Sequence, residues 1–319
     1  MESLQNLKKR IKSVKNVGQI AKAMELVAAT KMRKSQEIAL ASRPYAFASL
    51  ELLATISNFG QDLPELFQKR NVKAVLFVLV SSDKGLAGAF NSSVFRKFEA
   101  HMKRDEQKYS HEKKLYLAVG EKAYNYLIKK VGTIDPSVVL KKFTQVGDYT
   151  ATEQVKPIVD FIVKGYLEEK WDRVVIVSTH FKSALKQEAH VRRILPIDFD
   201  HIADTIKEII PERGKFADLM REQDINFIPQ GKNLREYSIE PSPKEVLQKL
   251  GEHLFFVQMY HLILEANASE HSARRMAMKT ASDNASELGG KLNLQYNKSR
   301  QARITTEISE ISAGAEALS

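Results

Sequence analysis

The segment "KAMELVAATKMRKSQ" (Lys22–Gln36) alternates apolar, small and basic residues without a proline or a glycine, which favours helix. Working outward from it, apolar or small residues recur every three or four positions, at Leu4, Leu7, Ile11, Val14, Val17, Ala21, Met24 and Ala28. This spacing is close to the heptad repeat of a coiled coil. No proline precedes Pro44, and a helical pattern resumes after it. The sequence therefore predicts an N-terminal coiled-coil helix over residues 1–58, and Pro44 is the position at which a kink would occur.

The other end of the chain predicts a second long helix, over residues 242–319. No proline follows Pro243, and the three-and-four spacing continues through Leu247, Leu250, Leu254, Val257, His261, Leu264, Ala268, His271, Arg275 and Met278. Gly289 and Gly290 are the weak point, since each glycine costs about 1 kcal/mol relative to alanine in a helix. A helix of this length, about 110 Å at ~1.5 Å per residue, exceeds what a globular domain needs.

The intervening residues 72–199 predict an α/β domain. Three apolar, β-branched runs, "VKAVLFVLVSSDKG", "KKLYLAVG" and "DRVVIVSTH", are typical of buried parallel strands. They alternate with helical stretches at about residues 91–104, 121–130 and 152–170, which favours a small doubly wound, Rossmann-like sheet. The run "QEAHVRRILPID" indicates a more exposed strand. Residues 200–241 are polar and irregular and are interpreted as an insertion.

Two terminal helices that flank one domain can each bury an apolar seam by packing against the other as an antiparallel pair. The second helix is longer, so about 18 residues at its C-terminus should extend beyond its partner as a single helix of about 27 Å. This end still carries an apolar stripe, at Ile304, Ile308, Ile311 and Leu318. A lone amphipathic helix of that length is marginal in water, so we expect something outside the chain to enclose it. A frayed tail is the alternative.

Composition narrows the class of protein. The 319 residues are 43% hydrophobic and 28% charged, as in a folded water-soluble protein. The longest apolar run, Ala74–Val80, is too short to cross a bilayer, and no signal-peptide pattern follows Met1. The absence of cysteine excludes disulfides and cysteine-ligated metals and suits a cytoplasmic protein.

The positive charge is concentrated at one end. The net charge is +10, and residues 1–43 hold ten Lys/Arg against three Glu, a net +7. Residues 242–319 hold nine charges of each sign. An acidic partner should therefore meet the N-terminal helix.

Three segments resemble the γ-subunit family of bacterial F-type ATP synthases. They are the N-terminal "IKSVKNVGQIAKAMELVAATKMRKSQ", the central "SSDKGLAGAFN" and the C-terminal "SARRMAMKTASDNASELGGKLNLQYNKSRQARITTEISEISAGA". The resemblance covers about two-thirds of the chain and implies a central-stalk rotor. In that role the paired helices turn inside an alternating ring of α and β subunits and transmit torque from the ion-driven c-ring of the membrane. The ε subunit is a further implied partner. The resemblance implies no catalytic site, cofactor or metal, and a peripheral location on the cytoplasmic face of the inner membrane.

The resemblance also implies contact residues on the helices. Arg275 and Lys279, one turn apart, match the place where the shaft meets a β loop, with Met24 nearby in the opposing helix. Arg300, Gln301 and Thr305 match an upper contact with β, although Arg303 stands where a small or polar residue is more common in the family. Without the resemblance, Met24 is an ordinary seam residue and the others are solvated helix positions. The C-terminal stripe Ile304, Ile308, Ile311 and Leu318 matches the apolar bearing.

The loop with Asp83, Lys84, Gly85 and Gly88 matches a contact region for β and ε. Glycine-rich loops between strand and helix also bind phosphate, but "SSDKGLAG" fits neither the dinucleotide nor the P-loop fingerprint. Tight turns before a helix explain the same residues, and we expect no nucleotide here. His253, His261 and His271 lack the spacing of a helical metal pair, and no catalytic set is assembled by the sequence.

Two other classes of protein share part of this pattern. An α/β enzyme with a basic coiled-coil arm could grip RNA through its phosphates, but the first 44 residues contain no aromatic side chain to stack on bases. A pure coiled-coil scaffold would need neither the α/β domain nor helices of unequal length.

Overall fold

The computed structural model describes residues 3–57, 64–108, 111–132, 135–147, 150–197 and 240–316. The chain forms two compact units, one of residues 1–29 with 274–319 and the other of residues 30–273. Helix α1 (Leu4–Ser57) and helix α7 (Pro243–Glu316) contribute to both units. Both predicted long helices are confirmed, and α1 is continuous through Pro44. The predicted insertion at residues 200–241 lies outside the described residues except for its last two.

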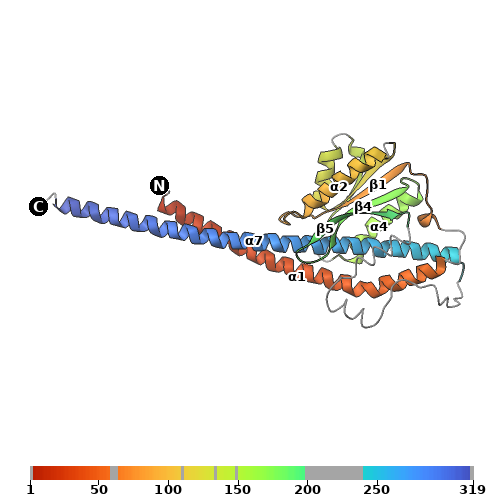
Figure 1. Ribbon diagram of the computed structural model, residues 1–319, viewed down its shortest axis with the longest axis horizontal. Helices are drawn as coiled ribbons and strands as arrows, with labels where there is room; N and C mark the ends of the chain where they lie inside the picture. The colour runs from red at the N-terminus through yellow and green to blue at the C-terminus, as the bar shows by residue number, and fades with distance from the viewer. Residues whose placement is uncertain are drawn as a thin grey trace. The chain divides into compact units, whose positions relative to one another are not determined.

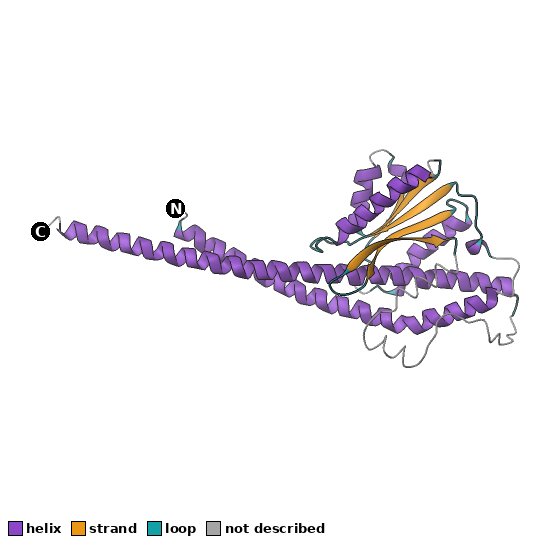
Figure 2. Ribbon diagram, in the orientation of Figure 1, coloured by secondary structure: helices purple, strands orange, loops and turns teal. Residues whose placement is uncertain are grey.

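The second unit contains one five-stranded sheet of order β3-β2-β1-β4-β5 (Figures 1 and 2). The strands are β1 (Ala74–Val80), β2 (Lys113–Val119), β3 (Val139–Phe143), β4 (Arg173–Phe181) and β5 (Gln187–Leu195). The first four are parallel, and β5 pairs antiparallel with β4. Every residue of β1 is buried, as its uninterrupted apolar run predicts for a central parallel strand. The predicted doubly wound sheet is confirmed.

Helices cover both faces of this sheet, as Figure 1 shows. One face packs against α2 (Phe90–Lys108) and α3 (Glu121–Leu127) through residues such as Phe77, Phe98 and Leu127. The other face packs against α4 (Thr152–Leu167) and the first part of α7 through residues such as Val78, Ile158 and Leu262. The first part of α7 therefore shares this face of the sheet with α4 and contributes to the core of the unit.

Two local features differ from the prediction. Strand β3 was not anticipated, because it is a short edge strand whose three central residues are exposed. The helix predicted over residues 121–130 ends as α at Leu127 and continues as a π-type turn over Ile128–Gly132. Strand β5 is half-buried over most of its length, as predicted.

The first unit is the pair of helical segments. Its seam buries Leu7, Ala21 and Ala28 of α1 with Met278 and Leu292 of α7. The axes approach closely at Gly18, where an added Cβ would lie 3.2 Å from the Cβ of Ala285. Small residues therefore let the two helices approach closely at this point.

Candidate functional site

The N-terminal segment of α1 presents an apolar surface outside the seam. Val17, Ile20 and Val27 are each more than half exposed and lie on one side of the helix, while Leu26, also more than half exposed, lies on another side. Met24 is half-buried on the same segment. The neighbouring Glu25 is buried and forms an ion pair with Lys22, in which Nζ of Lys22 lies 2.9 Å from Oε2 of Glu25. These exposed apolar side chains make this segment of α1 a candidate interaction surface.

The paired part of α7 carries the first group of predicted contact residues. Arg275 is half-buried and Lys279 is exposed, and Met278 between them is buried in the seam. Arg275 and Lys279 are four residues apart, so they lie on one face of the helix. Their positions beside a buried seam residue agree with two cations at the edge of the helical pair.

The end of α7 carries the second group. Every described side chain from Arg300 to Ala313 is exposed, and Leu292 is the last buried residue before them. The hydroxyl of Thr305 donates to the backbone oxygen of Gln301 at 3.0 Å, and Arg303 forms an ion pair with Glu307 at 2.8 Å. Arg300, Gln301 and Thr305 therefore lie together on an exposed stretch, separate along α7 from Arg275 and Lys279.

The apolar stripe of this stretch is also open. Ile304, Ile308 and Ile311 are 47%, 59% and 72% exposed. Leu318, the last member of the predicted stripe, lies outside the described residues. Steps of four and three residues place the three isoleucines on one helix face. This face has the chemistry of a buried contact but no cover among the described residues of its own unit.

The loop after β1 is a turn held by hydrogen bonds to neighbouring loops. The two oxygens of Asp83 accept backbone N–H bonds from Glu121 at 3.0 Å and from Gln145 at 2.8 Å, and so join the loops that follow β2 and β3. Gly88 has a positive φ of 55°, and an added Cβ at Gly85 would meet open space. The Asp83 carboxylate is thus occupied by the fold, whereas Lys84 and Gly85 lie on the exposed side of the turn.

Leu86 and Gly120 define the shape of this region and were not singled out from the sequence. Leu86 adopts a positive φ of 63° while remaining 62% exposed, so its strain is not offset by burial. Gly120 has φ 99°, and a Cβ there would lie 2.1 Å from the backbone oxygen of Ser81. Its glycine is therefore required by the close approach of two loops.

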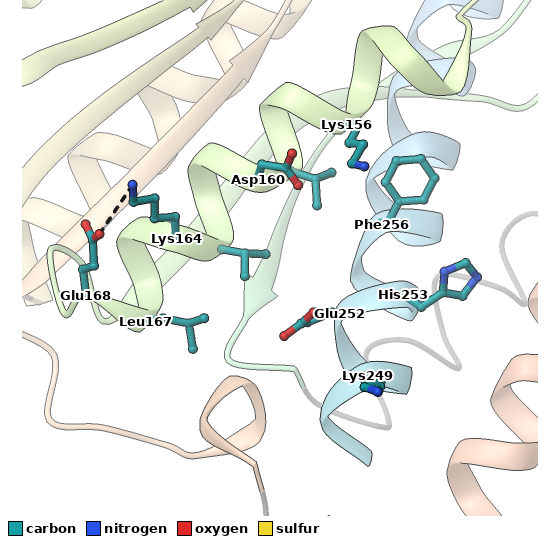
Figure 3. Close-up of a pocket in the computed structure, with 11 residues that line it drawn as sticks. Lys156, Asp160, Lys164, Leu167, Glu168, Lys249, Glu252, His253 and Phe256 are labelled. Carbon is teal, nitrogen blue, oxygen red and sulfur yellow. Dashed lines mark ion pairs between the residues drawn. The ribbon is translucent and has the colours of Figure 1, made fainter. Parts of the chain in front are cut away.

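A groove of about 820 Å³ lies between α4 and the first turns of α7 (Figure 3). Its apolar floor includes Val159, Val163 and Phe256, and charged side chains stand along both helices. On α4 the charges alternate in sign, and Lys164 pairs with Glu168 at 3.9 Å. Asp160, Glu252 and His253 are among the other ionisable side chains that line it.

Several ionisable groups of the second unit are held by local contacts. Hydrogen bonds from Lys182 and Lys186 lower the pKa of Glu188 to about 2. Burial and a 2.7 Å hydrogen bond to Glu99 raise the pKa of the Tyr126 hydroxyl. These contacts join neighbouring residues of the β4–β5 hairpin in one case and the helices α2 and α3 in the other.

The described part of the chain offers no cluster of three or more His, Cys, Asp or Glu side chains that could hold a metal. Within the same residues, no helix has a stretch long and apolar enough to cross a membrane.

Comparison with known proteins identifies the family. The family model described as ATP synthase matches residues 3–318. The ATP synthase gamma chain of Roseiflexus castenholzii is 36% identical, over 100% of this chain and 99% of that one. That of Trichlorobacter lovleyi is 35% identical over the same shares. The chain belongs to the ATP synthase gamma family.

Solved structures agree on the fold of this gamma-family chain. A chain of the Tetrahymena thermophila mitochondrial ATP synthase central stalk and c-ring has a TM-score of 0.55 at 21% identity, covering 82% of this chain and 99% of that one. A chain of the Euglena gracilis mitochondrial ATP synthase has a TM-score of 0.59 at 16% identity, covering 99% and 94%. The gamma-family fold, long terminal helices around an α/β domain, is the one predicted from the sequence.

Proposed function

We propose that this gamma-family chain is the central rotor shaft of an F-type ATP synthase and has no catalytic site of its own. It transmits torque between the ion-driven c-ring and an alternating ring of α and β subunits, which couples proton translocation to ATP synthesis or hydrolysis. The single observation that carries the proposal is the end of α7, where three isoleucines on one face are exposed over consecutive turns. A helix of this kind needs a surrounding partner.

The charge of the N-terminal helix supports the same role. A rotor must contact three equivalent partners in turn, so no single contact should hold it permanently. Long-range attraction between the basic residues of α1 and acidic loops of β provides a grip that can form and release repeatedly. The exposed apolar side chains of α1, such as Ile20 and Val27, would enter the contact only when the ring closes on them.

The contact residues proposed from the sequence keep their roles within this function. Met24, Arg275 and Lys279 meet a β loop at the paired part of the shaft. Arg300, Gln301 and Thr305 contact β higher on α7, and Ile304, Ile308, Ile311 and Leu318 run in the apolar bearing of the ring.

The loop after β1 is proposed to contact β and ε. Lys84 and Gly85 are exposed at this turn. Asp83 and Gly88 shape the turn, since Asp83 is bonded to two neighbouring loops and Gly88 has a positive φ.

The proposed division of labour follows the four segments of the chain. Residues 1–58 and 242–319 form the shaft, residues 72–199 form the domain that meets ε and the c-ring, and residues 200–241 are an insertion. The complex holds the chain at the cytoplasmic face of the inner membrane as a peripheral subunit. No cofactor or metal is required in this role.

Affinity purification of the full-length chain from its native cell tests the assembly. Mass spectrometry should find two nucleotide-binding subunits in three copies each, together with one small subunit. Recovery of the chain alone, or with RNA, would contradict the shaft and favour an enzyme with a basic arm.

A charge at Met24 tests the proposed grip. Met24→Lys should add an attraction to the acidic β loop and lower the number of protons pumped per ATP hydrolysed. An unchanged ratio in the assembled complex would mean that Met24 does not face that loop.

A further inference from the structure

The part of α7 in the second unit has an unusual stretch, in which all twelve residues from His261 to Ser272 are buried. Seven of the twelve are polar or ionisable: His261, Glu265, Asn267, Ser269, Glu270, His271 and Ser272. Burying polar groups is unfavourable unless they are hydrogen-bonded. Their partners therefore show what this stretch is built to hold.

Four of these residues bond to elements distant in the sequence, and we call Glu265, Asn267, His271 and Ser272 the polar collar. Glu265 lies 2.9 Å from Nδ1 of His180 on β4. The hydroxyl of Ser272 donates to the backbone oxygen of Ala184 at 2.7 Å, in the turn between β4 and β5, and accepts from Gln187 at 3.3 Å. This half of the collar is bonded to the β4–β5 hairpin.

The other half of the collar is bonded to the segment between β3 and α4. The amide nitrogen of Asn267 donates to the backbone oxygen of Val146 at 2.8 Å and to the hydroxyl of Thr150. Nε2 of His271 lies 2.9 Å from the backbone oxygen of Gly147. A carbonyl oxygen only accepts, so Nε2 carries the proton of this imidazole.

The two halves lie on opposite flanks of the helix. The apolar stripe that packs into the core consists of Phe255, Met259, Leu262, Ile263 and Ala266. At 3.6 residues per turn, the Glu265/Ser272 pair and the Asn267/His271 pair lie about 115° to either side of that stripe. The apolar face of the helix therefore packs into the core, and hydrogen bonds on both flanks join the helix to two other segments.

The segment bonded on one of these flanks is strained. Thr150 is a β-branched residue with a positive φ of 40°, and only 1% of it is exposed. Such a conformation persists only where the surroundings over-determine it. The contact with Asn267 is one of the bonds that hold it.

We propose that the polar collar locks α7 in rotational register against the α/β part of its unit and is the place where torque enters the shaft. The inference rests on the proposed function. Apolar packing is non-directional, and adjacent rows of side chains on a helix are nearly interchangeable, so the stripe alone lets the helix turn or slide by one row. Buried hydrogen bonds do not survive such a step, because the polar atoms would be left without partners.

The consequence is mechanical. Helix α7 is unbroken from Pro243 to Glu316, so a load applied to the collar continues along the same backbone. The core stabilises the fold of the unit, whereas the collar defines one angular position of the helix within it. Asn267, His271, Glu265 and Ser272 are thus positioning residues for coupling and touch no nucleotide.

The test uses the assembled complex in membrane vesicles, with ATP hydrolysis per complex and protons pumped per ATP as separate readouts. The double variant Asn267→Leu/His271→Leu removes three hydrogen bonds while keeping similar side-chain volume. Loss of even one such bond changes the occupancy of the native register about fivefold. We expect slip under load to rise at least that much, so that pumping per ATP falls while hydrolysis persists.

Two matched variants distinguish hydrogen bonding from packing. His271→Gln keeps an N–H close to the position of Nε2 and should restore coupling relative to His271→Leu. Ser269→Ala alters a residue in the same two turns whose buried hydroxyl has no hydrogen bond within the described structure, and it should leave coupling unchanged. If the double variant does not assemble, the comparison of His271→Leu with His271→Gln decides the matter.

If the double variant and the parent complex pumped equal numbers of protons per ATP, the proposed role of the collar would be wrong. An equal loss in Ser269→Ala would have the same consequence, because packing would then explain the effect. If the parent complex itself shows no ATP-driven pumping, the proposed function fails, and that result is separate from the comparison among variants.

Discussion

Helix α7 contains two stretches of similar length with opposite environments. From His261 to Ser272 every side chain is buried, and from Arg300 to Ala313 every one is exposed. Neither is the ordinary amphipathic surface helix, which buries one face and exposes the other. The first is surrounded by its own unit, and four of its polar residues bond to other elements of the same chain. The second carries isoleucines that find no cover among the described residues of its unit.

The difference shows how one helix serves two purposes. Where the chain must hold the helix, directional bonds from Glu265, Asn267, His271 and Ser272 specify its position. Where the helix is proposed to turn against other subunits, its apolar side chains can form only non-directional contacts, which do not fix one partner. Mutations in the two stretches should therefore act on different observables.

The largest expected effect is in the core beside the buried stretch. Leu262 is 1% exposed and belongs to the cluster that joins α7 to the sheet. Leu262→Ala should lower the free energy of unfolding by about 2–5 kcal/mol, because it removes buried methyl groups and leaves a cavity. Urea unfolding followed by fluorescence of Trp171, the single tryptophan and a buried one, measures it. A loss below about 1 kcal/mol would mean that the stretch is not packed as described.

The next effect comes from the buried pair of His180 and Glu265. Glu265→Ala leaves Nδ1 of His180 buried without its 2.9 Å partner, which should cost about 1–3 kcal/mol. Adding His180→Ala should cost less than the sum of the two single variants, because the pair is lost only once. Additive losses in the same urea titration would show that the two groups do not interact.

Much of this architecture could be predicted from the sequence, and the reason is local periodicity. The spacing of Leu4, Leu7 and Ile11 identifies a coiled coil without any knowledge of its partner. The run Ala74–Val80 identifies a central parallel strand for the same reason. In each case the pattern and the structure that it produces lie within a few residues of each other.

The collar could not be predicted in this way. His271 and Asn267 bond to residues 124 and 121 positions away, and Glu265 to one 85 positions away. His271 even occupies a seam position in the heptad pattern, where it reads as an ordinary helix residue. Strand β3 was missed for a related reason, since its exposed lysines follow no buried-strand pattern. The contact residues Met24, Arg275 and Arg300 remain predictions that depend on the resemblance.

A smaller effect is expected at the hairpin that bonds to the collar. The pKa of Glu188 is about 2 because Lys182 and Lys186 hydrogen-bond to it, against an ordinary value of 4.5. The depressed pKa means that its contribution to stability is present above about pH 4.5 and is lost as the pH falls toward 2. Glu188→Gln should therefore flatten the loss of stability over that range in acid unfolding curves. Lys182→Gln should do the same in part, and an unchanged acid profile in both would contradict the assigned contacts.

The smallest effect on stability is expected in the exposed stretch, and there its smallness is informative. Replacing Ile304, Ile308 and Ile311 by serine removes no buried contact within the described chain, so each change should alter the unfolding free energy by less than about 0.5 kcal/mol. The same triple variant should weaken retention of the chain in the α/β ring, because the serines remove the apolar contact that the ring is proposed to make with this face. Urea titration of the purified chain and co-purification of the complex measure the two quantities independently. A large loss of stability in the free chain would place the isoleucines in an internal contact, and unchanged retention would remove them from the proposed bearing. Only the combination of unchanged stability and weakened retention fits a helix end whose structural partner is another subunit.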